Sequence, residues 1–217
     1  MDYRAISAQG PALSQVNADA LVVVLTPDLA HTGDAALDRL IDDAVKAQDF
    51  ALKAGKTLYV HRPAGVKASR LLLSAAANAE PKAFKAAVAK GLAAVKDLGA
   101  AHTAVAAAQG LALTTAHAQA LALAVADATY VFRHTKPSAP KAGALKKVSL
   151  LCAAAEQAAV KQGLAQGEAL AQGVTLAREL GNLPGNHCTP SHLAVEARKL
   201  AREYKHISAQ VLERPAL

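Results

Sequence analysis

Ala20-Leu-Val-Val-Val-Leu25 is an unbroken run of six apolar residues, and it points most directly to the fold. A short valine-rich run bounded by polar residues favours a β-strand. A strand with one face in water would alternate apolar and polar residues, whereas a continuously apolar strand is typical of a sheet buried on both faces. The run therefore predicts an interior strand with helices on each side of it.

Similar short runs on either side predict further strands at 3–7, 57–61, 70–75, 102–107, 146–152 and 207–212. Helical patterns are predicted at 34–47, 81–98, 114–127, 156–180 and 190–205. The helix at 81–98 has Pro81 in its first turn and places Phe84, Val88 and Leu92 on one face. Thr189 is expected to cap the last helix. The alternation of strands and helices predicts a layered α/β domain.

The composition is that of a globular protein, with 53% hydrophobic residues among 217 and a net charge of +7. The two cysteines are too few for a disulfide framework. The first residues are polar rather than signal-like, and the alanine-rich stretch 104–128 is interrupted by polar residues. We therefore expect a cytoplasmic protein with no membrane partner.

The basic segment at 133–147 has two possible structural roles. It contains Pro137, Pro140 and Gly143, which indicate a loop. It carries no acid, but it does carry five cations, namely Arg133, Lys136, Lys141, Lys146 and Lys147. These residues are either a solvated loop or a set of contacts to DNA phosphates.

Two groups of polar residues contain side chains of the kinds that bind metal ions. The four acids Asp34, Asp38, Asp42 and Asp43 fit a solvated helix face with acids near its N-terminus better than a two-metal site. His187, Cys188 and His192 lack a fourth ligand and a familiar zinc spacing. A structural turn is expected there.

The stretch from Gly163 to Tyr204 resembles the leucyl (cytosol) aminopeptidase family. The resemblance rests on Ala177-Arg-Glu-Leu180, Asn182-Leu-Pro-Gly-Asn-His-Cys-Thr-Pro190 and Ala197-Arg-Lys-Leu-Ala201. These segments match a signature in which a helix leads into Asn-x-Pro-x-Asn-x-x-Thr-Pro and a second helix. The sequences of these segments look most similar to those of proteobacterial members of the family.

The resemblance implies the domain organisation. Residues 1–155 would form an amino-terminal macro-like domain, with a mixed sheet sandwiched between helices. Residues 156–181 would form a linker helix, and 182–217 the truncated start of the catalytic domain. Gly163, Gly167 and Gly173 fall inside that helix, where each costs about 1 kcal/mol relative to alanine. Close helix packing is the expected compensation.

The resemblance also implies the activity of the full-length protein. Family enzymes are two-metal exopeptidases, with Mn or Zn, that release amino-terminal residues from peptides and prefer leucine. They assemble as homo-hexamers. None of the family's metal-binding or catalytic motifs occurs in these 217 residues, so no catalytic or metal residue is assigned and no cofactor is expected in this chain. The chain alone is expected to be inactive, with a scaffold and assembly role beside the catalytic domain.

The alternative function is that of a binding module. It would contact DNA through the basic segment, or a nucleotide such as ADP-ribose through a macro-like cleft. Gln109-Gly110-Leu111 follows a predicted strand and precedes a helix, which is where a phosphate-binding loop would lie. A single glycine is equally typical of a plain strand–helix turn. Ala54-Gly55-Lys56-Thr57 precedes a strand instead of following one, so it is not expected to bind phosphate.

Overall fold

A computed structural model describes residues 1–140 and 143–212 and divides the chain into two compact units. The first unit consists of Met1–Val131 and Pro140–Gly173. The second consists of Phe132–Ala139 and Val174–Leu217. The helix α4 (Gln157–Asn182) belongs to both units.

The first unit is built on a six-stranded sheet with the strand order β1-β6-β5-β2-β4-β3. The strands are β1 (Asp2–Ser7), β2 (Ala20–Leu25), β3 (Thr57–His61), β4 (Arg70–Ala75), β5 (His102–Ala107) and β6 (Lys147–Cys152). Only β3 is antiparallel to its neighbour, so the sheet is mixed. These six strands confirm the predicted ones, with shifts of one residue at the starts of β1 and β6.

The strand β2 lies inside the sheet, between β4 and β5. Ala20 is aligned with Arg70 of β4 and with Thr103 of β5. All six residues of β2 are buried, which confirms the interpretation of its unbroken apolar run. An interior strand of a sheet that is covered on both faces has no side chain in water, so an alternation of apolar and polar residues would give it no advantage.

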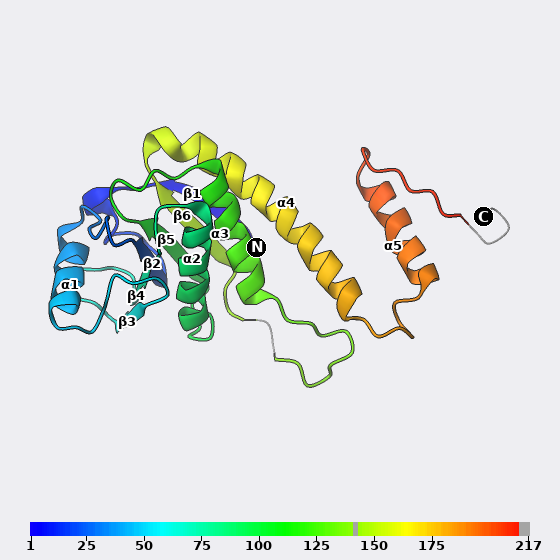
Figure 1. The fold of residues 1–217 in the computed structure, drawn as a ribbon, viewed down its shortest axis with the longest axis horizontal. Helices are drawn as coiled ribbons and strands as arrows, with labels where there is room; N and C mark the ends of the chain where they lie inside the picture. Colours follow the sequence, from blue (N-terminus) through cyan, green and yellow to red (C-terminus); the bar gives the residue numbers. More distant parts are fainter. Residues whose placement is uncertain (141–142, 213–217) are drawn as a thin grey trace. The chain divides into compact units, whose positions relative to one another are not determined.

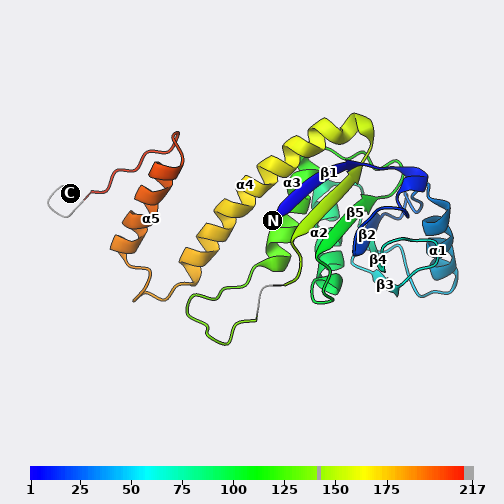
Figure 2. The same cartoon turned by 180° about the vertical axis from the view of Figure 1, so that it is seen from behind.

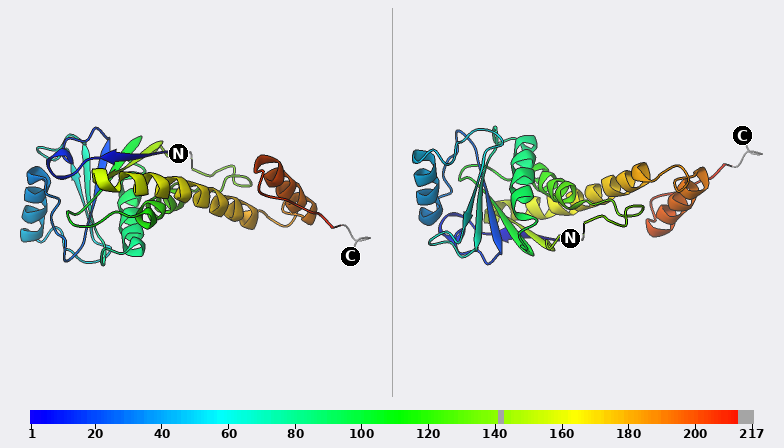
Figure 3. Two further views of the ribbon diagram at one scale, coloured as in Figure 1. Left: turned by 90° about the horizontal axis from the view of Figure 1, so that it is seen from above. Right: turned by 90° about the horizontal axis from the view of Figure 1, so that it is seen from below.

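Helices cover both faces of this sheet, as Figure 3 shows with the sheet seen on edge. On one face, α1 (Ala35–Lys46) packs Leu37 and Ile41 against Leu21 and Val23 of β2. On the other face lie α2 (Pro81–Val95) and α3 (Thr115–Thr129), which share a core with Val22 and Val24 of β2 (Figure 1). The predicted sandwich of a mixed sheet between helices is confirmed.

The first half of α4 packs along α3, on the same side of the sheet as α2 (Figure 2). Gly163 and Gly167 make this contact. A Cβ atom at Gly163 would lie 2.7 Å from Cβ of Ala118, and one at Gly167 would lie 2.7 Å from Cβ of Ala122. The expected close packing is therefore confirmed at these two positions. At Gly173 it is not, because a Cβ atom there would meet no atom of the described chain within 4 Å.

The second unit contains the end of α4 and the helix α5 (Pro190–Glu203). Thr189 caps α5 as predicted, since its Oγ1 accepts a hydrogen bond from the His192 backbone N–H at 3.2 Å. The predicted strand at 207–212 is wrong, because no strand is present between Ile207 and Leu212. A strand needs hydrogen bonds from a neighbour, and every strand of the described sheet belongs to the first unit.

No helix in the described ranges 1–140 and 143–212 combines the length and the apolar character that crossing a membrane would need.

Candidate functional site

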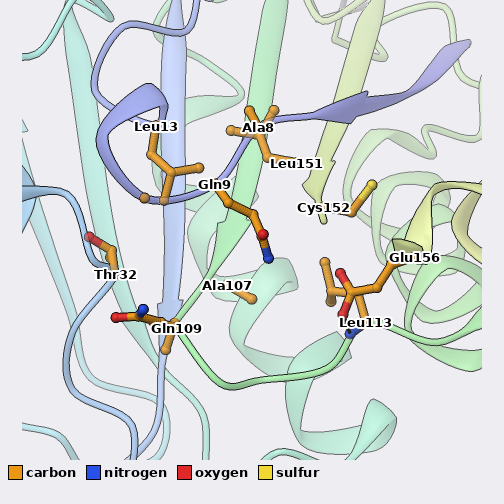
Figure 4. A pocket seen from close by; sticks show the side chains of 12 residues that line it. Ala8, Gln9, Leu13, Thr32, Ala107, Gln109, Leu113, Leu151, Cys152 and Glu156 are labelled. Carbon is orange, nitrogen blue, oxygen red and sulfur yellow. Dashed lines mark hydrogen bonds between the residues drawn. The ribbon is translucent and has the colours of Figure 1, made fainter. Parts of the chain in front are cut away.

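The first unit contains a cavity of about 250 Å³ beyond the carboxyl ends of β1, β5 and β6 (Figure 4). Ligands of open α/β sheets bind outside the carboxyl ends of their strands, because loops from several parallel strands meet there. Twelve residues line the cavity: Ala8, Gln9, Gly10, Leu13, Thr32, Ala107, Ala108, Gln109, Leu113, Leu151, Cys152 and Glu156. The topology of the sheet thus brings together loops that are far apart in the sequence.

Glu156 ties two of these loops together. It ends the short 3-10 helix η2 (Ala154–Glu156), directly before α4. Its Oε1 accepts a hydrogen bond from the backbone N–H of Leu113 at 2.9 Å, and its Oε2 accepts one from the backbone N–H of Ala153 at 2.9 Å. Since these loops follow β5 and β6, the carboxylate fixes one wall of the cavity.

Cys152 lies at the end of β6, and its buried thiol donates a long hydrogen bond of 3.7 Å to the carbonyl oxygen of Ile6. Burial raises the pKa of this thiol, and the negative charge of Glu156 raises it further, while Lys161 has a smaller opposite effect. A thiol with a raised pKa stays protonated at neutral pH. Cys152 is therefore part of the wall and not an activated nucleophile.

Gln9 and Gln109 provide side-chain amides at the cavity (Figure 4). Both residues are exposed. Two glycines beside Gln109 are required by the local geometry. Gly110 has a positive φ of +88°, and a Cβ atom at Gly33 would lie 2.9 Å from Oε1 of Gln109. Glycine at position 33 therefore leaves space for the Gln109 side chain.

The turn Gln109-Gly110-Leu111, the candidate phosphate-binding loop, lies at this cavity. Its position is the predicted one, between β5 and α3. The lining residues include no Lys or Arg, however, and the charged side chain among them is the carboxylate of Glu156. A nucleoside diphosphate would gain no cationic partner here, so the nucleotide alternative receives no support from the charge of this cavity.

The basic segment is divided between the two units. Arg133 and Lys136 lie in the second unit, whereas Lys146 and Lys147 lie in the first. Lys141 lies outside the described residues. Lys147 is the first residue of β6, so it belongs to the sheet and not to a loop. DNA binding by these residues stays a prediction without support.

The four acids near the start of α1 are better explained by local structure than by a metal site. Asp42 and Asp43 are exposed, as expected for a solvated helix face. Asp34 departs from that expectation, because it is buried and caps the helix. Asp38 is half-buried and accepts hydrogen bonds from the Thr32 backbone N–H at 2.6 Å and from its hydroxyl at 2.7 Å.

The group His187, Cys188 and His192 forms a turn before α5. The ring of His187 contacts that of His134 edge-on, with centroids 5.7 Å apart. The backbone N–H groups of His187 and Cys188 donate to the carbonyl oxygen of Pro184 at 2.8 and 2.9 Å. Across residues 1–140 and 143–212, no three His, Cys, Asp or Glu side chains lie together in a way that could hold a metal ion.

The sequence interpretation missed Gln9 and Glu156 as residues of a common site. A signal for Gln9 existed, because it follows a predicted strand, as Gln109 does. Glu156 carries no such signal, since it is the first residue of the predicted helix at 156–180 and its partner Leu113 is distant in the sequence. The hydrogen bond between them becomes visible only when the strand order is known.

Comparisons with known proteins agree with this fold. The model of the cytosol aminopeptidase family, N-terminal domain, matches residues 22–139. A probable cytosol aminopeptidase of Methylibium petroleiphilum is 53% identical over the whole chain, which spans 44% of that relative. A cytosol aminopeptidase of Pseudomonas aeruginosa is 36% identical over 87% of the chain and 39% of the relative. The chain therefore spans less than half the length of these relatives.

Two solved structures share the fold. A mutant of tomato leucine aminopeptidase superposes with a TM-score of 0.78 at 23% identity, covering 100% of this chain and 45% of that one. The bottromycin maturation enzyme BotP has a TM-score of 0.61 at 24% identity, covering 86% of this chain and 37% of that one. Together with the family match over more than half of its residues, these findings show that the chain belongs to the cytosol aminopeptidase family and contains that family's N-terminal domain.

Proposed function

We propose that this chain is the non-catalytic, amino-terminal part of a metal-dependent aminopeptidase that removes amino-terminal residues, leucine preferred, from peptides. The observation that carries the proposal is the match of residues 22–139 to the family's N-terminal domain. The chain spans 44% of the Methylibium relative, which leaves ample length for a separate catalytic domain there. In this arrangement the chain supplies a scaffold and assembly contacts for that domain.

The proposal places the two divalent ions, Mn or Zn, in the part of the relatives that this chain does not span. Two-metal hydrolases hold their ions about 3.5–4 Å apart with several converging side chains. Three buried or half-buried carboxylates of this chain have structural roles instead: Asp34 and Asp38 bind backbone N–H groups, and Glu156 joins two loops. The residues of this chain would thus act on substrate only through the domain that they support.

Residues 182–217 are proposed to begin the second domain, after a linker helix at 156–181 and an amino-terminal domain at 1–155. The properties of α5 support this division. It contains no buried residue, and the exposed fractions of Leu193 and Val195 are 46% and 52%. These two residues lie on opposite sides of the helix, and a helix with large apolar side chains exposed normally packs against other elements. We propose that the remainder of the second domain covers it.

The full-length protein is proposed to act in the cytoplasm, as the names of the cytosol aminopeptidases among its relatives suggest, and to assemble as a homo-hexamer. Its partners would be peptide substrates, bound at the catalytic domain, and further copies of itself.

A chimera tests the proposed function. This chain would replace the matching 217 residues of the Methylibium relative, which are 53% identical, and leucyl-peptide hydrolysis would be measured with Mn or Zn. The chimera should be active, because the scaffold is shared and the catalytic part is intact. The chain alone should be inactive under the same conditions. Metal-dependent hydrolysis by the purified 217-residue chain would contradict the proposal, as would a folded but inactive chimera.

A further inference from the structure

We propose that the cavity beyond β1, β5 and β6 binds a small aliphatic primary amine that also carries an amide group, such as an amino-acid amide. The inference depends on the geometry of the cavity and not on the proposed function, since the cavity lies wholly within the first unit. The binding site would be a property of this chain itself.

Its charge favours a cation. Glu156 is the charged side chain among the lining residues. Each of its oxygens accepts one backbone hydrogen bond, and a carboxylate has about four lone-pair sites in total. The carboxylate can therefore still accept from an ammonium group, and such charge-assisted hydrogen bonds are roughly twice as strong as neutral ones.

An organic cation fits better than a metal ion. A divalent cation would require several ligating side chains, and the described part of the chain brings no three of them together. The lining also includes the apolar side chains of Leu13, Leu113 and Leu151, which would leave a hydrated ion without partners. A primary amine attached to an aliphatic group satisfies both features, because the ammonium binds the carboxylate and the aliphatic group contacts the leucines.

The amide component of the ligand follows from Gln9 and Gln109. A primary amide has two donors and one acceptor, so each of these side chains can pair with a carboxamide of the ligand. Within residues 1–140 and 143–212, neither of these two side-chain amides makes a hydrogen bond. Figure 4 shows the Gln9 amide reaching over the cavity. These two side chains would therefore select ligands with a polar group opposite the amine.

The size of the cavity limits the ligand. Its volume of about 250 Å³ is below the range of about 300–1,000 Å³ that is usual for drug-sized ligands. One amino-acid amide is therefore a better match than a dinucleotide or a long peptide.

Nuclear magnetic resonance on the isotope-labelled 217-residue chain tests the inference. Leucinamide is titrated at neutral pH, and the backbone amide signals of Gln9, Gln109, Leu113 and Ala153 are followed. They should shift together and saturate. N-acetyl-leucinamide lacks the positive charge, so its affinity should be lower by a factor of about ten or more. Inorganic phosphate should not shift these signals. No shift with leucinamide, equal binding of the acetylated compound, or stronger shifts with phosphate would overturn the proposal.

Variants locate the binding. Gln9→Ala and Gln109→Ala should each weaken leucinamide binding by about two- to tenfold, the range of one lost hydrogen bond. Gln162→Ala, an exposed glutamine of α4 outside the cavity, should leave binding unchanged. Glu156→Gln should remove the preference for the charged compound, with a thermal melt to check folding. If Gln9→Ala and Gln162→Ala bind alike, the ligand lies elsewhere and the assignment fails.

Discussion

At the scale of single residues, Asp34 shows how a buried charge can be both helix cap and tertiary link. Its carboxylate accepts hydrogen bonds from the backbone N–H groups of Ala36 at 3.0 Å and Leu37 at 3.3 Å, which cap α1. It also accepts one from the backbone N–H of Ser14 at 2.8 Å. Three donors offset the cost of removing the carboxylate from water. The sequence predicts an acid at the helix start, but not the bond to Ser14.

Tyr3 carries a pH-dependent part of the stability. Burial and, to a smaller extent, the negative charge of Glu168 together raise the pKa of its phenol from 10.0 to about 12. Its hydroxyl donates to the carbonyl oxygen of Ala122 at 3.3 Å, which requires the protonated form. Because the folded protein holds this proton more tightly than the unfolded chain, the contribution is complete below pH 10 and is lost as the pH rises towards 12.

We therefore expect Tyr3→Phe to reduce the loss of stability between these two pH values. Denaturant unfolding at a series of alkaline pH values measures it, and Tyr59→Phe, on the edge strand β3 and 39% exposed, is the matched control. An identical alkaline decline in wild type and Tyr3→Phe would show that the phenol of Tyr3 does not carry this dependence.

At the scale of elements, the contact between α3 and α4 gives two glycines of one helix opposite roles. Gly163→Ala should lower the free energy of unfolding, because the new methyl group would overlap Ala118, and overpacking costs about 1–3 kcal/mol. Gly173→Ala should raise it by up to about 1 kcal/mol, since alanine is the better helix former and the position is open.

The pair of variants is its own control, because both make the same chemical change in the same helix. Urea unfolding of the two proteins measures the difference. Equal effects at both positions would mean that the close approach of α3 and α4 does not limit the side chain at position 163.

Other elements show how far a local pattern reaches. The run at 20–25 predicts β2 with its observed bounds, because six apolar residues satisfy both covered faces of the sheet. The pattern at 207–212 fails, although Ile207 and Leu212 have suitable side chains. Their exposed fractions are 38% and 54%, and an apolar residue without a neighbouring strand has nothing to pair with.

At the scale of the whole molecule, the two units differ in how their helices are held. In the first unit, α2 buries Phe84, Val88 and Leu92 in the core. In the second, α5 buries no residue. Hydrogen bonds of a helix without buried contacts open by local unfolding, whereas those of a core helix open only with larger parts of the protein.

Hydrogen exchange measured by mass spectrometry should therefore show the backbone amides of α5 exchanging faster than those of α2 by several orders of magnitude. In the chimera with the Methylibium relative, the same amides should become protected if the second domain covers α5. Equal protection of α5 and α2 in the 217-residue chain would contradict this expectation.

The sequence by itself determined the order and the type of the helices and strands up to α5, the cap at Thr189, and the family, because each depends on residues close together in the chain. Only the tertiary structure decided the strand order, and with it the cavity where Gln9, Gln109 and Glu156 meet. The local pattern of apolar residues indicates which face of a strand is buried, but it does not indicate which strand lies beside it. Neighbouring strands are chosen by the packing of all helices and strands at once, so a site assembled from three loops appears only with the complete sheet.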